Sequence, residues 1–442
     1  MSTGDRITEK EEERPLEGKN AETVALEEAK DRERPAFRVG AQTTFASFVY
    51  RNYRLWFGGQ AASLVGTWMQ STAQGFFIYQ LTNSPVYLGY VGFASGLPMW
   101  IFSWFGGVVS DRMSRRKLML VTQTGMMLLA FILAGLTFTH AVQAWHIVIL
   151  ALLNGIANAF DAPARQSIVV ELVDREDLSN AIALNATMFN LGTAVGPAVA
   201  GVAYALFGPA WCFTINGISF LAVIAALLMM DLEPQPVWSQ ASSPLRDLHE
   251  GLGYVASTPI VGMIILTIVF FAIFGASFAT ILPAWAVDML HGDAATNGYL
   301  QSARGLGSLI GALAIASLGR THIRGKILTL GSLGYPLLLL AWSFVRWLPL
   351  SLLMLVGVGI MQILTFNMAN ILVQSEVPDH LRGRVMSIYT LGFFGFMPLG
   401  AMLYGGMAEW WGEPITVGLC AGVLLAYSIF LYVRLPWLRK LI

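Results

Sequence analysis

A few charged side chains lie within or directly beside long apolar stretches of this sequence. Arg304 lies about five residues into one such stretch, while Asp161 and Asp288 lie at the ends of two others. Ionisable groups surrounded by apolar residues are costly, and they usually serve a binding site, a gate or ion movement. We therefore expect Arg304 to bind a substrate or to close an outer gate, unless its long side chain only extends to a polar interface.

Uncharged amide side chains form a second polar group within the apolar stretches. Gln70 and Gln74 lie one helical turn apart, and so do Asn154 and Asn158. Amides bind neutral polar groups without a charged partner, although each could also form a hydrogen bond between two helices. Together with Arg304, the candidate residues of a substrate cavity are Gln70, Gln74, Asn154, Asn158, Asn185, Asn190, Gln301, Gln362 and Asn367.

The elements that carry these side chains are predicted to be membrane-spanning helices. The chain has 442 residues, of which 55% are hydrophobic and only 12% charged, with a mean hydropathy of +0.61. Crossing a bilayer takes about 20 apolar residues of helix, and about twelve such runs occur. They cover residues 55–79, 87–109, 118–138, 145–160, 181–207, 211–230, 259–281, 299–318, 327–345, 347–372, 385–407 and 415–433.

Charge patterning divides the chain into four parts. Residues 1–45 are rich in both acidic and basic groups and have no apolar core, which predicts a disordered tail. Residues 46–230 and 259–442 each hold six predicted spans, and residues 231–258 form a linker with an amphipathic helix. Lys and Arg concentrate in the loops on the side of the tail, which places both termini in the cytoplasm.

The loop after the second span carries Gly107, Asp111, Arg112, Arg115 and Arg116 in a pattern that resembles the signature of the major facilitator superfamily. A similar basic loop follows the eighth span, as expected for a duplicated six-span unit. The resemblance implies a twelve-helix fold in two halves that alternate access to a central cavity. It also implies a cytoplasmic gate of Gly107, Asp111, Arg112, Arg115, Arg116, Asp161 and Arg165, in which Arg112 or Arg115 meets Asp161.

The fifth span contains Gly192, Gly196, Pro197 and Gly201, which resemble a motif of exporters and antiporters in this superfamily. Small residues four apart let helices approach closely, and Pro197 lets the helix bend, so ordinary helix packing also explains the pattern. The segment from Asp161 to Ala181 resembles the branch of siderophore exporters and macrolide efflux proteins. That resemblance implies proton-coupled export of bulky organic molecules, with Asp161 and Asp288 as the candidate coupling groups.

The remaining expectations follow from what the sequence lacks. It has no phosphate-binding loop for ATP, no catalytic constellation and no Cys/His cluster, so we expect neither an enzyme nor a metal or cofactor site. Cys212 and Cys420 are expected to be buried thiols. The expected partners are an organic substrate, a proton and the lipid bilayer of the plasma (inner) membrane, with no nucleic acid, and the chain is expected to be a monomer. An importer, a uniporter and a non-transporting sensor with the same fold remain open as alternatives.

Overall fold

The computed structural model describes residues 45–112, 114–232, 244–318 and 324–434, without the side chains of residues 103–112, 244–247 and 318. Two compact units, Met1–Ala46 and Ser47–Ile442, divide the chain. The second unit contains the helices that are long enough to cross a bilayer. Its described part is entirely helical.

The first half of this unit contains six long helices. They are α3 (Arg51–Thr82), α4 (Pro85–Arg112), α5 (Arg115–Phe138), α6 (Ala144–Leu172), α7 (Leu178–Phe207) and α8 (Pro209–Met229). Turn residues determine several of the boundaries. Asn83, with φ of 49°, ends α3, and Gly208, with φ of 83°, separates α7 from Pro209 at the start of α8.

The second half begins after a short helix, α9 (Pro244–Ser257), within the segment predicted as the linker. Its unbroken long helices are α12 (Ala294–Leu318), α13 (Arg324–Trp342), α14 (Leu348–Glu376) and α17 (Glu413–Arg434). Two further spans are irregular. Residues 259–289 comprise α10 (Pro259–Phe270), η2 (Phe271–Gly275), η3 (Ala276–Ile281), α11 (Leu282–Ala284) and η4 (Trp285–Met289), and residues 379–411 comprise α15 (Asp379–Thr390), η5 (Leu391–Gly395) and α16 (Met397–Trp411).

The irregular turns have a specific character. η2, η4 and η5 are single π-helical turns, and η3 is a 3₁₀ segment. Such changes of hydrogen-bond register within a long helix often mark functional regions. Both interrupted spans contact α4 of the first half, so the irregular backbone lies where the two halves meet.

Nine helical segments of the described chain are long and apolar enough to cross a membrane. The helices α3, α4 and α12 reach membrane length as well, with 32, 28 and 25 residues. Many large apolar side chains on these helices are exposed, such as Leu313 at 61% and Leu353 at 68%. A soluble protein rarely exposes so much apolar surface, whereas lipid would cover it. The predicted all-helical membrane protein is confirmed.

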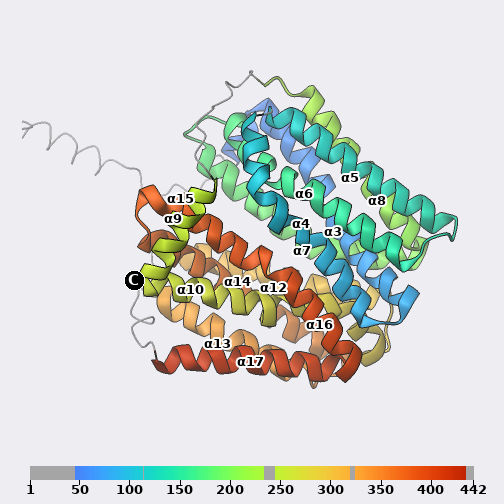
Figure 1. Cartoon of the computed structure of the whole chain (residues 1–442). Coiled ribbons are helices and arrows are strands. Elements are labelled where there is room, and N and C mark those ends of the chain that lie inside the picture. Colours follow the sequence, from blue (N-terminus) through green and yellow to red (C-terminus); the bar gives the residue numbers. More distant parts are fainter. Residues whose placement is uncertain (1–44, 113, 233–243, 319–323, 435–442) are drawn as a thin grey trace, which may run out of the picture. The chain divides into compact units, whose positions relative to one another are not determined.

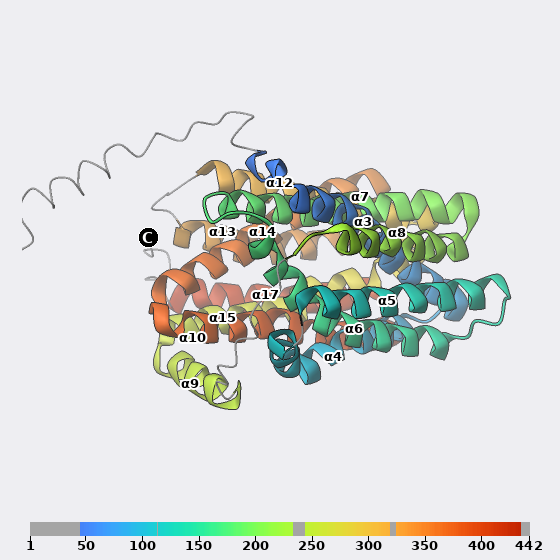
Figure 2. The ribbon, with the colours of Figure 1, turned by 90° about the horizontal axis from the view of Figure 1, so that it is seen from above.

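Short connections make successive helices antiparallel, so the helix ends fall on two sides (Figure 1). We call the side at which α3 begins and α17 ends the terminal side, and the opposite side the far side. The helices α3–α8 group together, as do α10–α17, and the long helices of both groups run side by side (Figures 1 and 2). The halves meet mainly through α7 against α12 and α4 against α16.

Candidate functional site

Glycines make the contact between the halves close. A side-chain carbon at Gly305 of α12 would lie 2.5 Å from the carbonyl oxygen of Thr193, and one at Gly298 would lie 2.5 Å from that of Pro197. In the predicted antiporter-type motif of α7, Gly201 faces Ala295 across the halves. Gly192 and Gly196 face Leu64 and Trp68 of α3 in their own half. The motif therefore packs on two sides and brings three helices together.

Polar side chains from both halves meet close to this contact. Thr72 of α3 donates a hydrogen bond to Gln301 of α12 over 3.4 Å, and Gln301 donates to Asn297 over 3.2 Å. Thr72 is 3% exposed and Asn297 is fully buried. Among the predicted cavity residues, Gln301 thus forms a described hydrogen bond to the opposite half.

Arg304 lies three residues further along α12, near the middle of the helix. The sequence predicts it about five residues into its membrane span and hence in the outer half of the membrane, and in the structure it is the eleventh of the 25 residues of α12, within the far-side half of the helix. The helix begins at Ala294, five residues before the predicted start, because the polar segment from Thr296 to Gly298 is helical although it is not apolar. Arg304 donates through Nη1 to Oε1 of Gln362 on α14 over 3.3 Å.

The other predicted cavity amides do not converge on Arg304 by hydrogen bonds. Gln70 accepts a 2.7 Å hydrogen bond from Asn216 of α8, and Asn190 donates to the carbonyl oxygen of Ala186 in its own helix. These two amides therefore support helices rather than present free groups. Among the described residues, no side-chain hydrogen-bond partner is recorded for Gln74, Asn154, Asn158, Asn185 or Asn367, and the oxygen of Asn185 is buried.

On the far side, a carboxylate connects the halves. The hydroxyl of Tyr79, at the end of α3, donates a short hydrogen bond to Asp288 of η4. Glu413, the first residue of α17, is 5% exposed and interacts with Asp288. Tyr79 and Glu413 are functional candidates that sequence analysis missed, although an acid at the start of an apolar span was a usable signal for Glu413.

Two further contacts join the halves between the far side and the middle. Ser84, between α3 and α4, donates a 2.6 Å hydrogen bond to Glu409 of α16. The indole N–H of Trp100 donates to the carbonyl oxygen of Gly395, and its ring packs against Phe396 with centroids 5.2 Å apart. The described hydrogen bonds between the halves therefore lie on the far side or at mid-depth.

The predicted gate lies on the terminal side. Gly107, Asp111 and Arg112 are outside the residues whose side chains the structure describes. Arg115 pairs with Glu171 and donates to the carbonyl oxygen of Ser167, and Arg116 donates to the carbonyl oxygen of Leu228. The expected contact of Arg115 with Asp161 is thus replaced by one with Glu171.

Asp161 is 2% exposed and fully engaged within its own half. It accepts hydrogen bonds from Thr122 over 2.8 Å and from Gln123 over 2.9 Å, and it lies 3.7 Å from the Nε of Arg165. Asp161 and Arg165 lie one turn apart because α6 continues through Pro163 to Leu172. The sequence indicated that the span ends near Phe160.

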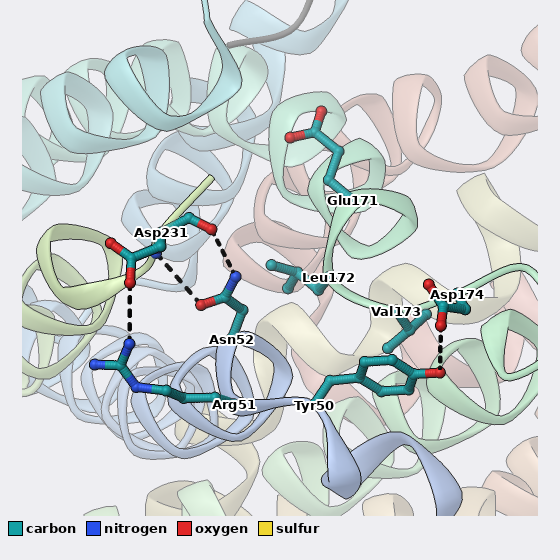
Figure 3. Close-up of a pocket in the computed structure, with 8 residues that line it drawn as sticks. All are labelled: Tyr50, Arg51, Asn52, Glu171, Leu172, Val173, Asp174 and Asp231. Carbon is teal, nitrogen blue, oxygen red and sulfur yellow. Dashed lines mark hydrogen bonds and ion pairs between the residues drawn. The ribbon is translucent and has the colours of Figure 1, made fainter. Parts of the chain in front are cut away.

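A shallow pocket of about 400 Å³ opens on the terminal side, lined by Tyr50, Arg51, Asn52, Glu171, Leu172, Val173, Asp174 and Asp231 (Figure 3). Arg51 pairs with Asp231 over 3.0 Å, and the Tyr50 hydroxyl lies 2.9 Å from Asp177 and 3.1 Å from Asp174. The bond to Asp177, followed by partial burial and Asp174, raises the pKa of Tyr50 to about 12, so this hydroxyl stays a donor at neutral pH. The interactions of Tyr50 and Arg51 hold the start of α3 against the other helices of the first half.

Comparison with known proteins matches residues 42–441 to a family described as transmembrane secretion effectors. The staphyloferrin A transporter of Staphylococcus aureus is 24% identical over 86% of this chain and 95% of its own length. The multidrug efflux pump Tap of Mycolicibacterium fortuitum is 25% identical over 83% and 91%. The enterobactin exporter EntS of Shigella flexneri is 24% identical over 88% and 92%.

Solved structures match the fold. The nucleoside transporter NupG has a TM-score of 0.68 at 14% identity, covering 87% of this chain and 98% of its own. A bacterial homologue of the lysosomal transporter Spinster has a TM-score of 0.65 at 13% identity, covering 90% and 97%. These matches confirm the fold and the resemblance that the motifs indicated.

Proposed function

Because this chain belongs to the transmembrane secretion effector family of major facilitator transporters, we propose that it exports bulky organic molecules in exchange for protons. Family membership makes it a multi-pass membrane transporter and not an enzyme. The direction of transport, the substrate class and the coupling ion are the proposed part. Relatives named as a staphyloferrin transporter, an enterobactin exporter and a multidrug efflux pump support export of large organic molecules.

The orientation follows from the positions of the basic residues. Arg115, Arg116, Arg165 and Arg175 lie on the terminal side, whereas Arg346 lies in the loop between α13 and α14 on the far side. Because Lys and Arg are retained in cytoplasmic loops, we assign the terminal side to the cytoplasm and the far side to the exterior. The far-side contacts then form a closed outer gate, as expected of a transporter that is ready to receive cargo from the cell.

The observation that carries the proposal is the hydrogen bond of Tyr79 to Asp288, since a carboxylate of one half takes part in closing the outer gate. Asp288 is exposed already in this closed arrangement, so opening the gate changes its surroundings by separating it from Tyr79 and breaking the hydrogen bond between them. A carboxyl group that changes its surroundings between two states binds protons differently in each state, and this difference is what couples a proton gradient to the conformational change. Asp161 accepts its hydrogen bonds within one half, so we favour Asp288 as the coupling group.

Transport measurements test this function directly. Metabolites retained by cells that lack the chain, compared with cells that express it, identify a substrate. We expect that substrate to accumulate in inside-out vesicles when the vesicle interior is made acidic, because protons then leave the vesicle as the substrate enters. Uptake should stop when a protonophore removes the proton gradient while a sodium gradient is kept. Uptake that persists under these conditions would rule out proton antiport, and a metabolite that enters intact cells through the chain would rule out export.

A further inference from the structure

Arg304 is a cation near the middle of α12, within the segment that is predicted to span the membrane. It is the eleventh residue of α12, which starts at Ala294. At a rise of 1.5 Å per residue, its backbone lies about 15 Å from the helix start and about 7.5 Å from Tyr299, where the predicted apolar span begins. Its Nε is buried within the protein, so this part of the guanidinium does not extend to a polar interface. The guanidinium must therefore be satisfied by groups within the protein or by a ligand.

The described residues provide only some of the hydrogen-bond partners that the guanidinium of Arg304 needs. Gln362 accepts one hydrogen bond from Nη1, while the buried Nε has no partner among the described residues. In that part of the chain, no carboxylate forms an ion pair with Arg304. Asp293, the acid nearest in sequence on this side, accepts hydrogen bonds from Thr296, and Asp288 is bonded to Tyr79 and interacts with Glu413. The guanidinium thus has neither its charge nor its hydrogen-bonding capacity matched.

A second unpartnered donor lies on α13, which packs against α14 beside Gln362, because a side-chain carbon at Gly334 would lie 2.9 Å from the sulfur of Met361. Tyr335 of α13 is fully buried, its hydroxyl has no hydrogen-bond partner among the described residues, and it interacts electrostatically with Arg304. Three helices of one half, α12, α13 and α14, thus supply a guanidinium, a phenol and an amide to one region. A guanidinium only donates hydrogen bonds, and a phenol readily donates one. Their common complement is an oxygen atom that carries negative charge.

We propose that Arg304, Tyr335 and Gln362 form a subsite for an anionic oxygen group, a carboxylate or a group of similar charge, on the transported molecule. This inference rests on the proposed function in that it assigns the anion to the cargo. The planar fork of a guanidinium fits two oxygens of one carboxylate. The bound anion neutralises the charge of Arg304, while the rest of the cargo molecule contacts less specific surfaces of the two halves. An organic anion is therefore preferred over its neutral analogue.

Binding to the purified protein in detergent, without any gradient, tests the subsite separately from transport. The probes are dansylglycine, a fluorescent carboxylate, and dansylglycinamide, its neutral counterpart. For the unmodified protein we expect the Kd of the carboxylate to be about tenfold lower than that of the amide. Arg304→Gln should bring the ratio close to one, and Tyr335→Phe should reduce it about threefold. Arg304→Lys should keep part of the preference, because it keeps the charge.

Arg346→Gln is the matched control, since Arg346 lies on the far side with its guanidinium 5.1 Å from the centre of the Trp285 ring. It should keep the full preference, and elution as a single species should show that each variant is folded. Equal binding of both probes to the unmodified protein, or an undiminished preference in Arg304→Gln, would overturn the subsite. Displacement of dansylglycine by chloride as effectively as by acetate would assign Arg304 to an inorganic ion instead. A protein that prefers the carboxylate but exports nothing would refute the proposed function alone.

Discussion

The two ends of the helical bundle are held together in different ways. On the far side, Tyr79 bonds to Asp288 and Ser84 bonds to Glu409, and each bond joins one half to the other. On the terminal side, the described ion pairs do not join the two halves: Arg115 pairs with Glu171 within the first half, and Arg384 of the second half pairs with Glu250 of α9. Far-side bonds must therefore break when the halves separate there, whereas these terminal-side pairs can persist through the whole cycle.

The largest effect is expected from two glycines of α12 that face different neighbours. A side chain at Gly305 would press on Thr193 and Ala194 of the other half, and one at Gly307 would press on the backbone of Val356 in its own half. Gly305→Val should lower transport about tenfold or more while the protein still reaches the membrane. Gly307→Val should instead lower the yield of folded protein.

Labelling of Thr72→Cys with a membrane-impermeant maleimide in intact cells measures opening from the far side, because Thr72 is 3% exposed in the closed arrangement. Cys212 and Cys420 are 0% and 2% exposed and should add little background. Labelling should rise in Gly305→Val. If both valine variants merely fail to fold, the distinction between contacts across the halves and contacts within one half is wrong at this depth.

A smaller but sharper effect is expected from Asp288→Asn. The substitution keeps the size of the side chain but removes the charge that strengthens its hydrogen bond with Tyr79. The rate of Thr72→Cys labelling should rise about tenfold, and proton-driven transport should fall. Asp231→Asn is the control, because Asp231 pairs with Arg51 within the first half on the terminal side. Equal labelling in both variants would contradict the role of Asp288 in closing the far side.

The smallest effect is expected from Ser84→Ala, which removes a 2.6 Å hydrogen bond to Glu409 at an exposed position. Water can replace an exposed bond, so the labelling rate should rise only about twofold to threefold. Ser317→Ala, which loses a hydrogen bond within its own helix on the terminal side, should change nothing. A response to Ser84→Ala as large as that to Asp288→Asn would show that charge is not what holds the far side closed.

The fold could be read from the sequence largely because lipid demands long apolar helices, and the spans were found within a few residues of their observed positions. The errors occurred where helices continue through polar residues. The start of α12 was missed because Thr296 and Asn297 are polar, and the end of α6 was missed because it contains Asp161, Arg165 and Glu171. Hydropathy reports where a helix meets lipid and not where its hydrogen bonds end, so the sequence located the apolar spans and missed the polar ends of α12 and α6.

The sequence identified individual residues of the site but not the contacts between them. Residue types indicated that Gln301, Arg304 and Asp288 matter, because polar groups in apolar helices are costly. Their partners could not be inferred, since Tyr79 is an ordinary aromatic residue near a helix end and bonds to Asp288 across 209 positions of sequence. Likewise, Asp161 and Glu171 were both available acids for Arg115, and only the length of α6 decides between them.

The π and 3₁₀ turns of residues 259–289 and the π turn of residues 379–411 have a mechanical consequence. A helix whose hydrogen bonds change register is more easily bent than an unbroken one such as α3 or α5. The second half therefore contains two spans that bend easily, in addition to the bends that Pro98, Pro163 and Pro197 allow in α4, α6 and α7 of the first half. Spans that bend easily can close around cargo molecules of different size while the angle between the two halves stays the same.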